Sequence, residues 1–256
     1  RVGNSKSTPL DPSALHIDEN DVYILDRKSN QVMAVDSETG TNSRSLLRLG
    51  KSAVITDLFV RDRQIYLLDS KRSGVLVVDT SGSYLRDFFT SGNPGLRFKN
   101  PKRILVNYQG YIYILDDWGI RGFTMEGVPF VSAPVNSAIS MSLGEDQLLR
   151  VLRHSSKGQV VEYLDQILKI VSASMVMIQD RRSANIADLA INQWGEMHVI
   201  NRDATNIGKL GPNGAILPNT VFGAFDKGSQ IGVFQYPTQI KCGANGDTSI
   251  IGILDS

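Results

Sequence analysis

Four side chains in this sequence have the widest range of chemistry, and each stands apart from the others. They are His16, His154, His198 and Cys242. A single cysteine excludes an internal disulfide, and it also excludes a zinc or iron–sulfur site built on several thiolates. No serine or cysteine is accompanied by a neighbouring base, so nucleophilic catalysis is not indicated. From these residues we expect no catalytic centre and no metal site.

A second set of polar side chains is regularly spaced. Asp26, Asp69, Asp116, Asn201 and Asp255 each close a short apolar run, and they recur on average about every 46 residues. Such a ring of carboxylates suggests a metal site, but nearly every repeat carries one, whereas a binding site breaks the symmetry. A short carboxylate at a strand end accepts hydrogen bonds from loop amides. We therefore interpret these five as structural turn residues.

The apolar runs before these residues indicate how each repeat folds. They are hydrophobic at consecutive positions, as in Ile65–Leu68, so both faces of the strand are expected to be buried. A β-sandwich buries one face only, and a parallel β-helix repeats at about half this period. Radially packed blades bury both faces. The sequence therefore predicts an all-β fold, a six-bladed β-propeller of four-stranded antiparallel blades. The first strands are expected at Ala14–Ile17, Leu58–Val60, Ile104–Val106, Ile139–Met141, Leu189–Ile191 and Gln239–Cys242.

The expected blades make residues 1–256 a single domain. Asp116 and Asn201 are separated by about two repeat periods, and a degenerate copy of the repeat, Leu148–Leu152, lies between them. The stretch Gln159–Ile178 also fits a helical stripe, but the period favours two strands that turn at Asp165-Gln166. The last blade is expected to be incomplete or to be closed by a strand from residues 1–8. The approximate blade boundaries are 10–50, 54–97, 98–134, 135–178, 185–225 and 235–256 plus 1–8.

Several segments resemble the NHL-repeat family of propellers. The segment IYLLDSKRSGVLVVDTSGSYLRDFF (Ile65–Phe89) is similar to one NHL repeat. The segments Phe222–Ile240 and Ser91–Asp116 are similar to the linker that joins NHL blades. YWTD propellers and six-bladed propellers of bacterial surface and periplasmic proteins are near relatives. The resemblance implies no single function, because the family includes ligand sensors, interaction scaffolds, RNA-binding domains and a few enzymes.

Two metal sites found in enzymes of this architecture can be compared with the sequence. Propellers that resemble the peptide-amidating lyases hold zinc with three histidines, but the histidines here fall at non-equivalent positions in blades one, four and five. Lactonase-like propellers hold calcium with a Glu, two Asn and an Asp. Asp57, Asn136, Asn185 and Asp188 could approach the channel, yet no first strand carries a Glu. We expect no metal and no cofactor.

Charge is the more informative feature of the sequence. The 27 Lys+Arg nearly balance the 26 Asp+Glu, for a net charge of +1. The loops after the second and fourth strands are nevertheless rich in Lys and Arg, whereas the loops after the first and third carry mainly Asp and Glu. A basic face attracts anionic partners over about one Debye length, roughly 8 Å at physiological salt. The residues expected to bind a partner on this basic face are Arg27, Lys28, Lys71, Arg72, Lys102, Arg103 and, as an aromatic anchor, Trp118.

The sequence thus predicts a non-enzymatic scaffold that binds a protein or peptide, preferentially an acidic one, on its basic face. RNA binding by the same face is an alternative, although the pI near 8.0 lies below the value of about 9 typical of nucleic-acid modules. A channel-centred metal-dependent lyase or lactonase is a second alternative. No apolar run approaches the roughly 18 residues that cross a bilayer, so membrane insertion is not expected. The compartment stays open, with a periplasmic or extracellular location favoured over a cytoplasmic one.

Overall fold

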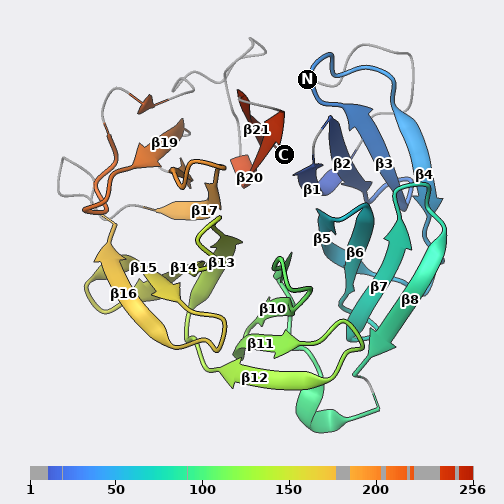
Figure 1. The fold of residues 1–256 in the computed structure, drawn as a ribbon, viewed down its shortest axis with the longest axis horizontal. Coiled ribbons are helices and arrows are strands. Elements are labelled where there is room, and N and C mark those ends of the chain that lie inside the picture. The colour runs from blue at the N-terminus through green and yellow to red at the C-terminus, as the bar shows by residue number, and fades with distance from the viewer. Residues whose placement is uncertain are drawn as a thin grey trace.

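The structure is a computed structural model, which describes residues 11–18, 20–90, 92–176, 185–202, 206–217, 220–221, 237–245 and 248–255. The strands in these ranges form six antiparallel sheets, each built from strands that are consecutive in the sequence. Figure 1 shows the sheets arranged around a common centre, as in a β-propeller. No helix in the described part of the chain is long and apolar enough to cross a membrane.

The first three sheets have four strands each. The first contains β1 (Pro12–Asp18), β2 (Asp21–Asp26), β3 (Gln31–Asp36) and β4 (Arg44–Arg48). The second contains β5 (Ile55–Arg61), β6 (Gln64–Asp69), β7 (Gly74–Asp79) and β8 (Tyr84–Phe89). After the short 3-10 helix η1 (Pro94–Leu96), the third contains β9 (Arg103–Val106), β10 (Ile112–Asp116), β11 (Gly119–Phe123) and β12 (Pro129–Ala133).

The later sheets become smaller along the chain. The fourth contains β13 (Ala138–Leu143), β14 (Leu149–Ser155), β15 (Gly158–Leu164) and β16 (Ile170–Met175). The fifth contains β17 (Ile186–Ile191), β18 (Met197–Asn201) and β19 (Asn206–Leu210), and the last pairs β20 (Pro237–Asn245) with β21 (Thr248–Asp255). The structure therefore shows five blades of three or four strands and a two-stranded sheet. The expected full set of six four-stranded blades is not shown.

The first strand of every sheet lies innermost, and these inner strands touch one another around the ring. Contacts join β1 to β5, β5 to β9, β9 to β13, β13 to β17, β17 to β20 and β20 to β1. The last strands β4, β8, β12 and β16 lie on the outside (Figure 1). The two-stranded sheet thus stands where the ring closes. The expected closing strand at 1–8 lies outside the described residues.

The second strands are buried on both faces, as their consecutive apolar residues predict. Every residue of β10 and β18 is buried. Tyr113 and Phe123 are among the largest side chains with no exposed surface, and one apolar cluster runs from β5 through β10 to β14. Each sheet therefore shares its core with the sheets on either side, which is the environment that a radial stack of blades provides.

Two sequence expectations for the fourth sheet can be compared with the structure. The stretch from 159 to 178 contains β15 and β16 with a turn between them, so the prediction of two strands is confirmed. In that turn the Asp165 carboxylate accepts hydrogen bonds from the backbone of Ile167 and Lys169. In the fourth sheet Arg153 pairs with Ala138, as Asp69 pairs with Ile55 in the second sheet. Arg153 therefore occupies the position at which other blades carry Asp, and the degenerate copy of the repeat expected at Leu148–Leu152 lies one residue too early.

Candidate functional site

The inner strands share an irregularity that turns polar side chains into the central channel. In β5, for example, the pairing register shifts between Ile55 and Asp57, and β1, β13, β17 and β20 shift at the same place. Such a bulge re-aims the side chain that follows it. The residues at this pairing position form what we call the ring layer: Ala14, Asp57, Arg103, Ser140, Asp188 and Gln239.

Side chains of the ring layer join the strands where the ring closes. Asp57 accepts hydrogen bonds from the backbone N–H of Ile104 at 3.0 Å and from Nε2 of Gln239 at 3.1 Å. The Oε1 atom of Gln239 accepts from the backbone N–H of Leu15 at 2.8 Å. These bonds tie β20 to β1 and β5, and β5 to β9. Ala14 is small enough to let Gln239 reach across the first blade.

Asp188 is the most heavily bonded residue of the ring layer. It is 1% exposed, and it accepts hydrogen bonds from the Ile240 N–H at 2.9 Å and from the Ser140 hydroxyl. Arg103 forms an ion pair with it at 3.1 Å. Burial lowers the pKa of Arg103, but the carboxylates of Asp188 and Asp57 outweigh burial and raise it above the ordinary value. Arg103 is thus the partner of a buried carboxylate, and its expected role in binding a partner stays a prediction.

The same bonds argue against the two metal sites. The carboxylates of Asp57 and Asp188 already accept hydrogen bonds, and Asn136 is exposed outside the ring layer. His154 lies on β14 and is exposed, whereas His16 is buried on β1. Within the described ranges no three His, Cys, Asp or Glu side chains lie close enough to hold a metal ion. The residues therefore fit neither the calcium nor the zinc site that the resemblance implies.

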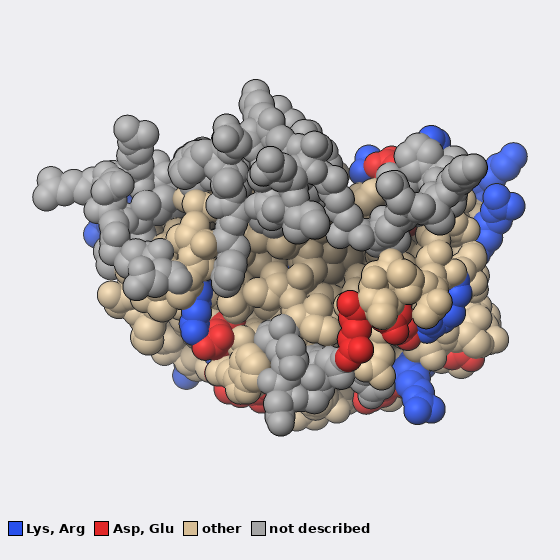
Figure 2. Space-filling model, turned by 90° about the horizontal axis from the view of Figure 1, so that it is seen from above, with Lys and Arg blue, Asp and Glu red and all other residues tan. Residues whose placement is uncertain are grey.

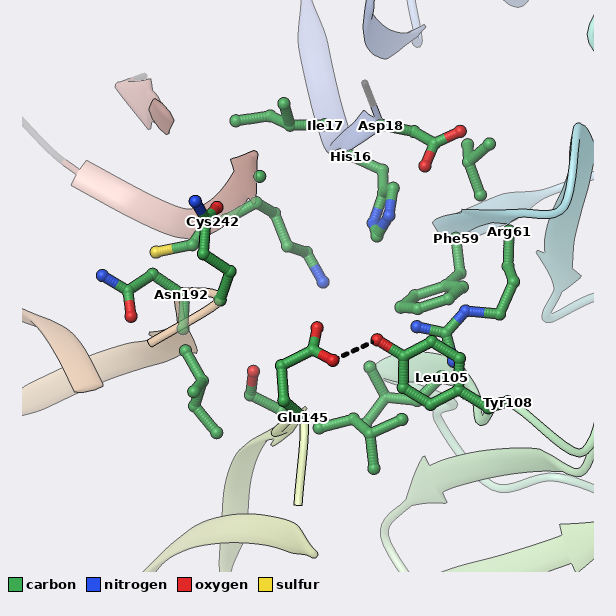
Figure 3. A pocket seen from close by; sticks show the side chains of 18 of the residues that line it. His16, Ile17, Asp18, Phe59, Arg61, Leu105, Tyr108, Glu145, Asn192 and Cys242 are labelled. Atoms are coloured by element: carbon green, nitrogen blue, oxygen red, sulfur yellow. Dashed lines mark hydrogen bonds between the residues drawn. The ribbon is translucent and has the colours of Figure 1, made fainter. Parts of the chain in front are cut away.

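Two cavities lie on opposite sides of the ring layer. One has a volume of about 580 Å³ and opens toward the loops after the first strands; we call it the channel cavity. Figure 3 shows side chains from several blades converging on it. Its floor is formed by the residues two positions after the ring layer, and loop residues form its rim. The floor residues are His16, Phe59, Leu105, Ser142, Ala190 and Lys241.

His16 is a neutral polar group on this floor. Its ring lies 4.3 Å from the ring of Phe59, and its Nδ1 is buried without a hydrogen-bond partner. Burial, Lys241 and Arg61 hold the pKa of His16 well below its ordinary value, against a smaller opposing effect of the Val60 backbone. His16 therefore stays uncharged at neutral pH.

Aromatic and charged side chains form one wall of the channel cavity. The guanidinium of Arg61 donates to the Val106 carbonyl at 2.6 Å and lies 4.1 Å from the ring centre of Tyr108. The Tyr108 hydroxyl donates to Oε2 of Glu145 at 2.6 Å (Figure 3). Burial raises the pKa of Tyr108, and the hydrogen bond to Glu145 adds to the effect. Opposite this wall, burial raises the pKa of the Cys242 thiol to about 12, so the thiol is unreactive at neutral pH.

The second cavity, of about 560 Å³, opens on the expected basic face, and we call it the basic mouth. Lys102, Arg103, His154 and Arg202 line it, and no described Asp or Glu does. The Lys102 ammonium lies 3.1 Å from Asp117 and donates to the Ala138 carbonyl at 3.0 Å. Arg202 is exposed. The basic mouth is therefore positive, although two of its cations already have carboxylate partners.

The other expected binding residues differ in how freely they reach solvent. Arg27, Lys28 and Lys71 are exposed in the loops after second strands. Arg72 lies 2.6 Å from Asp69 and 4.4 Å from the ring centre of Phe89, so it is partly engaged within its own blade. Figure 2 views the ring from its edge and shows Lys and Arg side chains interspersed with Asp and Glu.

Trp118 lies beside a groove on the third blade. Its side chain is 68% exposed, in the loop between β10 and β11. The groove has a volume of about 610 Å³ and runs along the outer strand β12. Phe130, 41% exposed, lies on this strand. Besides Trp118, the groove is lined by Pro94, Leu96, Arg97, Arg121, Phe130, Val131 and Pro134, among others.

In the first three blades, the carboxylates expected to fix turns accept hydrogen bonds from nearby backbone amides. The Asp26 carboxylate accepts from the N–H of Asp11 at 2.9 Å and of Lys28 at 3.2 Å. Asp69 accepts from two amides of the following loop, each at 3.0 Å, and Asp116 accepts from the Trp118 N–H at 2.8 Å. Asn201 is buried at the corresponding end of β18. Asp255 pairs with Pro237 at the end of the last sheet.

Comparison with known proteins identifies the fold and no family. No family model matches the chain, and no curated protein matches its sequence. A streptogramin B lyase is 14% identical, with 98% of this chain and 78% of that chain covered and a TM-score of 0.67. A gluconolactonase from Xanthomonas campestris is 12% identical, with 96% and 83% covered and a TM-score of 0.69. A chain of a nidogen/laminin complex is 13% identical, with 78% and 76% covered and a TM-score of 0.58.

These identities show a shared β-propeller fold alone. The NHL resemblance therefore stays a prediction. Both an enzyme and a chain from a protein complex have this fold, so the fold does not decide between catalysis and binding.

Sequence reasoning overlooked the residues of the channel cavity. Lys241, Arg61, Tyr108 and Glu145 were not among the expected site residues, and His16 was considered only as a metal ligand. One signal was present in the sequence: Lys241 is a lysine within the first strand of a blade, where a buried inner strand is expected.

Proposed function

We propose that this protein is a non-enzymatic propeller scaffold, with the sheet of β20 and β21 as its sixth, NHL-like blade. Its basic face, made by the loops after the second and fourth strands, binds a protein or peptide. The observation that carries the proposal is Trp118, a 68% exposed tryptophan at the edge of a groove. Exposed aromatic side chains of this size are typical anchors of protein interfaces.

The charges around Trp118 favour an acidic partner. The exposed Arg97 lines the groove, whereas Arg121, which also lines it, is paired with Asp116 at 2.6 Å; the basic mouth of the same face has no acidic lining residue among those described. Arg27, Arg72, Lys102 and Arg103 have carboxylate partners within the protein, so the exposed Lys28 and Lys71 are the cations best able to steer a partner.

The two tryptophans of the chain allow a direct test. In a Trp194→Phe variant, Trp118 is the sole tryptophan, so its fluorescence reports contact in the groove. A random twelve-residue peptide library is selected on this variant and counter-selected on the protein with Trp118→Ala. We expect acidic peptides to be enriched and to shift the emission of Trp118 to shorter wavelength when titrated.

Matched charge reversals complete the test. Lys71→Glu is expected to weaken the selected peptides at least about tenfold, because a steering and contact charge changes sign. Lys169→Glu, an equally exposed change in the loop after a third strand, is expected to leave affinity unchanged. Peptides that bind the Trp118→Ala protein equally well, or no enrichment at all, would reject the groove as a binding site.

RNA is the first alternative ligand of this face. A uridine-rich twelve-nucleotide RNA is the probe, because single strands offer both phosphates and stacking bases. Binding whose log affinity falls with log salt by about 0.7 per phosphate contact, and which Trp118→Ala abolishes, would replace the peptide proposal.

Catalysis in the channel is the second alternative, because a lyase and a gluconolactonase share the fold. Among the described residues no donor set fits a metal site, and for this reason we favour the scaffold. Hydrolysis of a gluconolactone that is lost in a His16→Phe variant would instead establish an enzyme.

A further inference from the structure

Lys241 lines the channel cavity, and no described residue forms a hydrogen bond or an ion pair with its ammonium. Its side chain is 8% exposed on the inner strand β20, two residues after Gln239 of the ring layer. Among the residues that the structure describes, none accepts a hydrogen bond from its ammonium, and no carboxylate lies within 4.0 Å. Its ammonium is not among the fully buried polar atoms, so it faces the cavity and is available to a ligand.

A second cation lines the same cavity as Lys241. Arg61 on the cavity wall and Lys241 on its floor both lower the pKa of His16 electrostatically. Arg61 forms no ion pair with any described carboxylate and donates instead to a backbone carbonyl. The neutral ring of His16 has a buried, unpartnered Nδ1, which adds a hydrogen-bonding atom without adding charge. The floor is therefore suited to a small anionic group.

The rim of the same cavity is negative. Asp18, Asp62 and Glu145 line it against one rim cation, Arg63, and the Tyr108 hydroxyl donates a hydrogen bond to the Glu145 carboxylate. Charge along the cavity thus changes from positive at the floor to negative at the rim. A simple anion would meet repulsion at the rim, and a simple cation would meet repulsion at the floor. A molecule with an anionic and a cationic end complements both.

We propose that the channel cavity binds a small zwitterion, an amino acid whose carboxylate lies at Lys241 and whose ammonium lies at Glu145. Phe59, Leu105 and Ile191 line the cavity and offer apolar surface to the carbon chain between the two ends. The volume of about 580 Å³ lies within the range of small-molecule sites, about 300–1,000 Å³. This site opens on the face opposite the basic mouth, so it goes beyond the proposed peptide-binding function and does not depend on it.

A series of linear probes separates the two charges. Calorimetry of the full chain compares three probes: 6-aminohexanoate carries both charged ends, hexanoate carries the carboxylate alone, and hexylamine carries the amine alone. The four- and eight-carbon ω-amino acids, 4-aminobutanoate and 8-aminooctanoate, test the distance between the two charges. We expect at least one of the three amino acids to bind about tenfold tighter than hexanoate and hexylamine. The corresponding aminoalkyl phosphonate shows whether a phosphorus anion replaces the carboxylate.

Variants assign the two ends of the ligand. Lys241→Met is expected to weaken the amino acid about tenfold or more and to leave hexylamine unchanged, because only the carboxylate contact is lost. Lys241→Arg keeps the charge and is expected to keep binding, which controls for misfolding. Glu145→Gln is expected to weaken the amino acid and hexylamine but not hexanoate. Lys169→Met, in an exposed loop, is the neutral control.

Three results would overturn the proposal. They are unchanged affinity in a folded Lys241→Met protein, equal affinity for the amino acid and one of the singly charged probes, and no binding by any of the three amino acids at about 10 mM.

Discussion

The ring layer and the floor of the channel cavity lie two residues apart on the same inner strands, yet their polar groups differ in how many hydrogen-bond partners they have. In the ring layer, Asp188 accepts from Ser140, Arg103 and the Ile240 N–H, and Arg103 Nε is the one buried side-chain polar atom of these described residues without a hydrogen-bond partner. On the cavity floor, the ammonium of Lys241 and the Nδ1 of His16 have no partner among the described residues.

The difference separates polar groups that hold the ring together from polar groups that are available to a ligand. Buried polar atoms in proteins are almost always hydrogen-bonded, so a satisfied network is a structural device. An unsatisfied group of the same burial adjoining a cavity indicates a binding site. The comparison can be sharpened by removing members of each layer in turn.

Removing Asp188 should have the largest effect. The Asp188→Ala change leaves the Arg103 guanidinium, the Ser140 hydroxyl and the Ile240 N–H without their shared acceptor. We expect a loss of about 3–5 kcal/mol in the free energy of unfolding, measured by urea denaturation. Asp11→Ala breaks the ion pair with Arg27, in which both side chains are more than half exposed, and should cost about 1 kcal/mol or less. Equal losses for the two variants would remove the structural role of the ring layer.

Removing Gln239 should have the next largest effect. The Gln239→Ala change deprives the Leu15 N–H of its acceptor and Asp57 of one donor, where β20 meets β1 and β5. We expect a loss of about 1–3 kcal/mol in urea denaturation. Gln31→Ala, which removes only a contact with the exposed Ser45, is the control and should be nearly neutral. A neutral Gln239→Ala would show that ring closure does not depend on this bond.

Removing Lys241 should change stability little. In Lys241→Met a charge without a partner is replaced by an apolar side chain of similar length, so we expect the free energy of unfolding to rise or to stay within about 1 kcal/mol. The same urea titration measures it. A loss as large as that of Asp188→Ala would mean that the ammonium has a structural partner, and the contrast between the two layers would fail.

The smallest effect is confined to acidic pH. Burial, Lys241 and Arg61 lower the pKa of His16 in the folded protein. In the unfolded chain His16 takes up a proton as the pH falls below its ordinary pKa of 6.5, whereas in the folded protein it stays neutral to lower pH. Stability from this group is therefore complete above about pH 6.5 and is lost as the pH falls below it. The free energy of unfolding should fall less between about pH 7.5 and pH 5.5 in His16→Gln than in the unmodified protein. Identical pH dependence would exclude His16 as a group that is kept neutral by the fold.

Much of the fold and part of the site could be predicted from the sequence. The strand ending at Asp69 and the turn at Asp165 follow from local patterns, because consecutive apolar residues and turn residues act within a few positions. Asp57 and Asp188 were considered near the channel only as possible calcium ligands, and no metal site was expected. Their true partners, Gln239 and Arg103, lie in other blades, 182 and 85 residues away, and no local pattern shows such pairing.

The sequence by itself determined the repeat, the order of strands and the side chains that must be buried, because these depend on spacing along one strand. Only the tertiary structure decided which buried polar groups find partners. That outcome depends on where six separate strands place their side chains around one channel. Asp188 meets Arg103 there, whereas Lys241 faces a cavity, and neither result is written in the residues next to them.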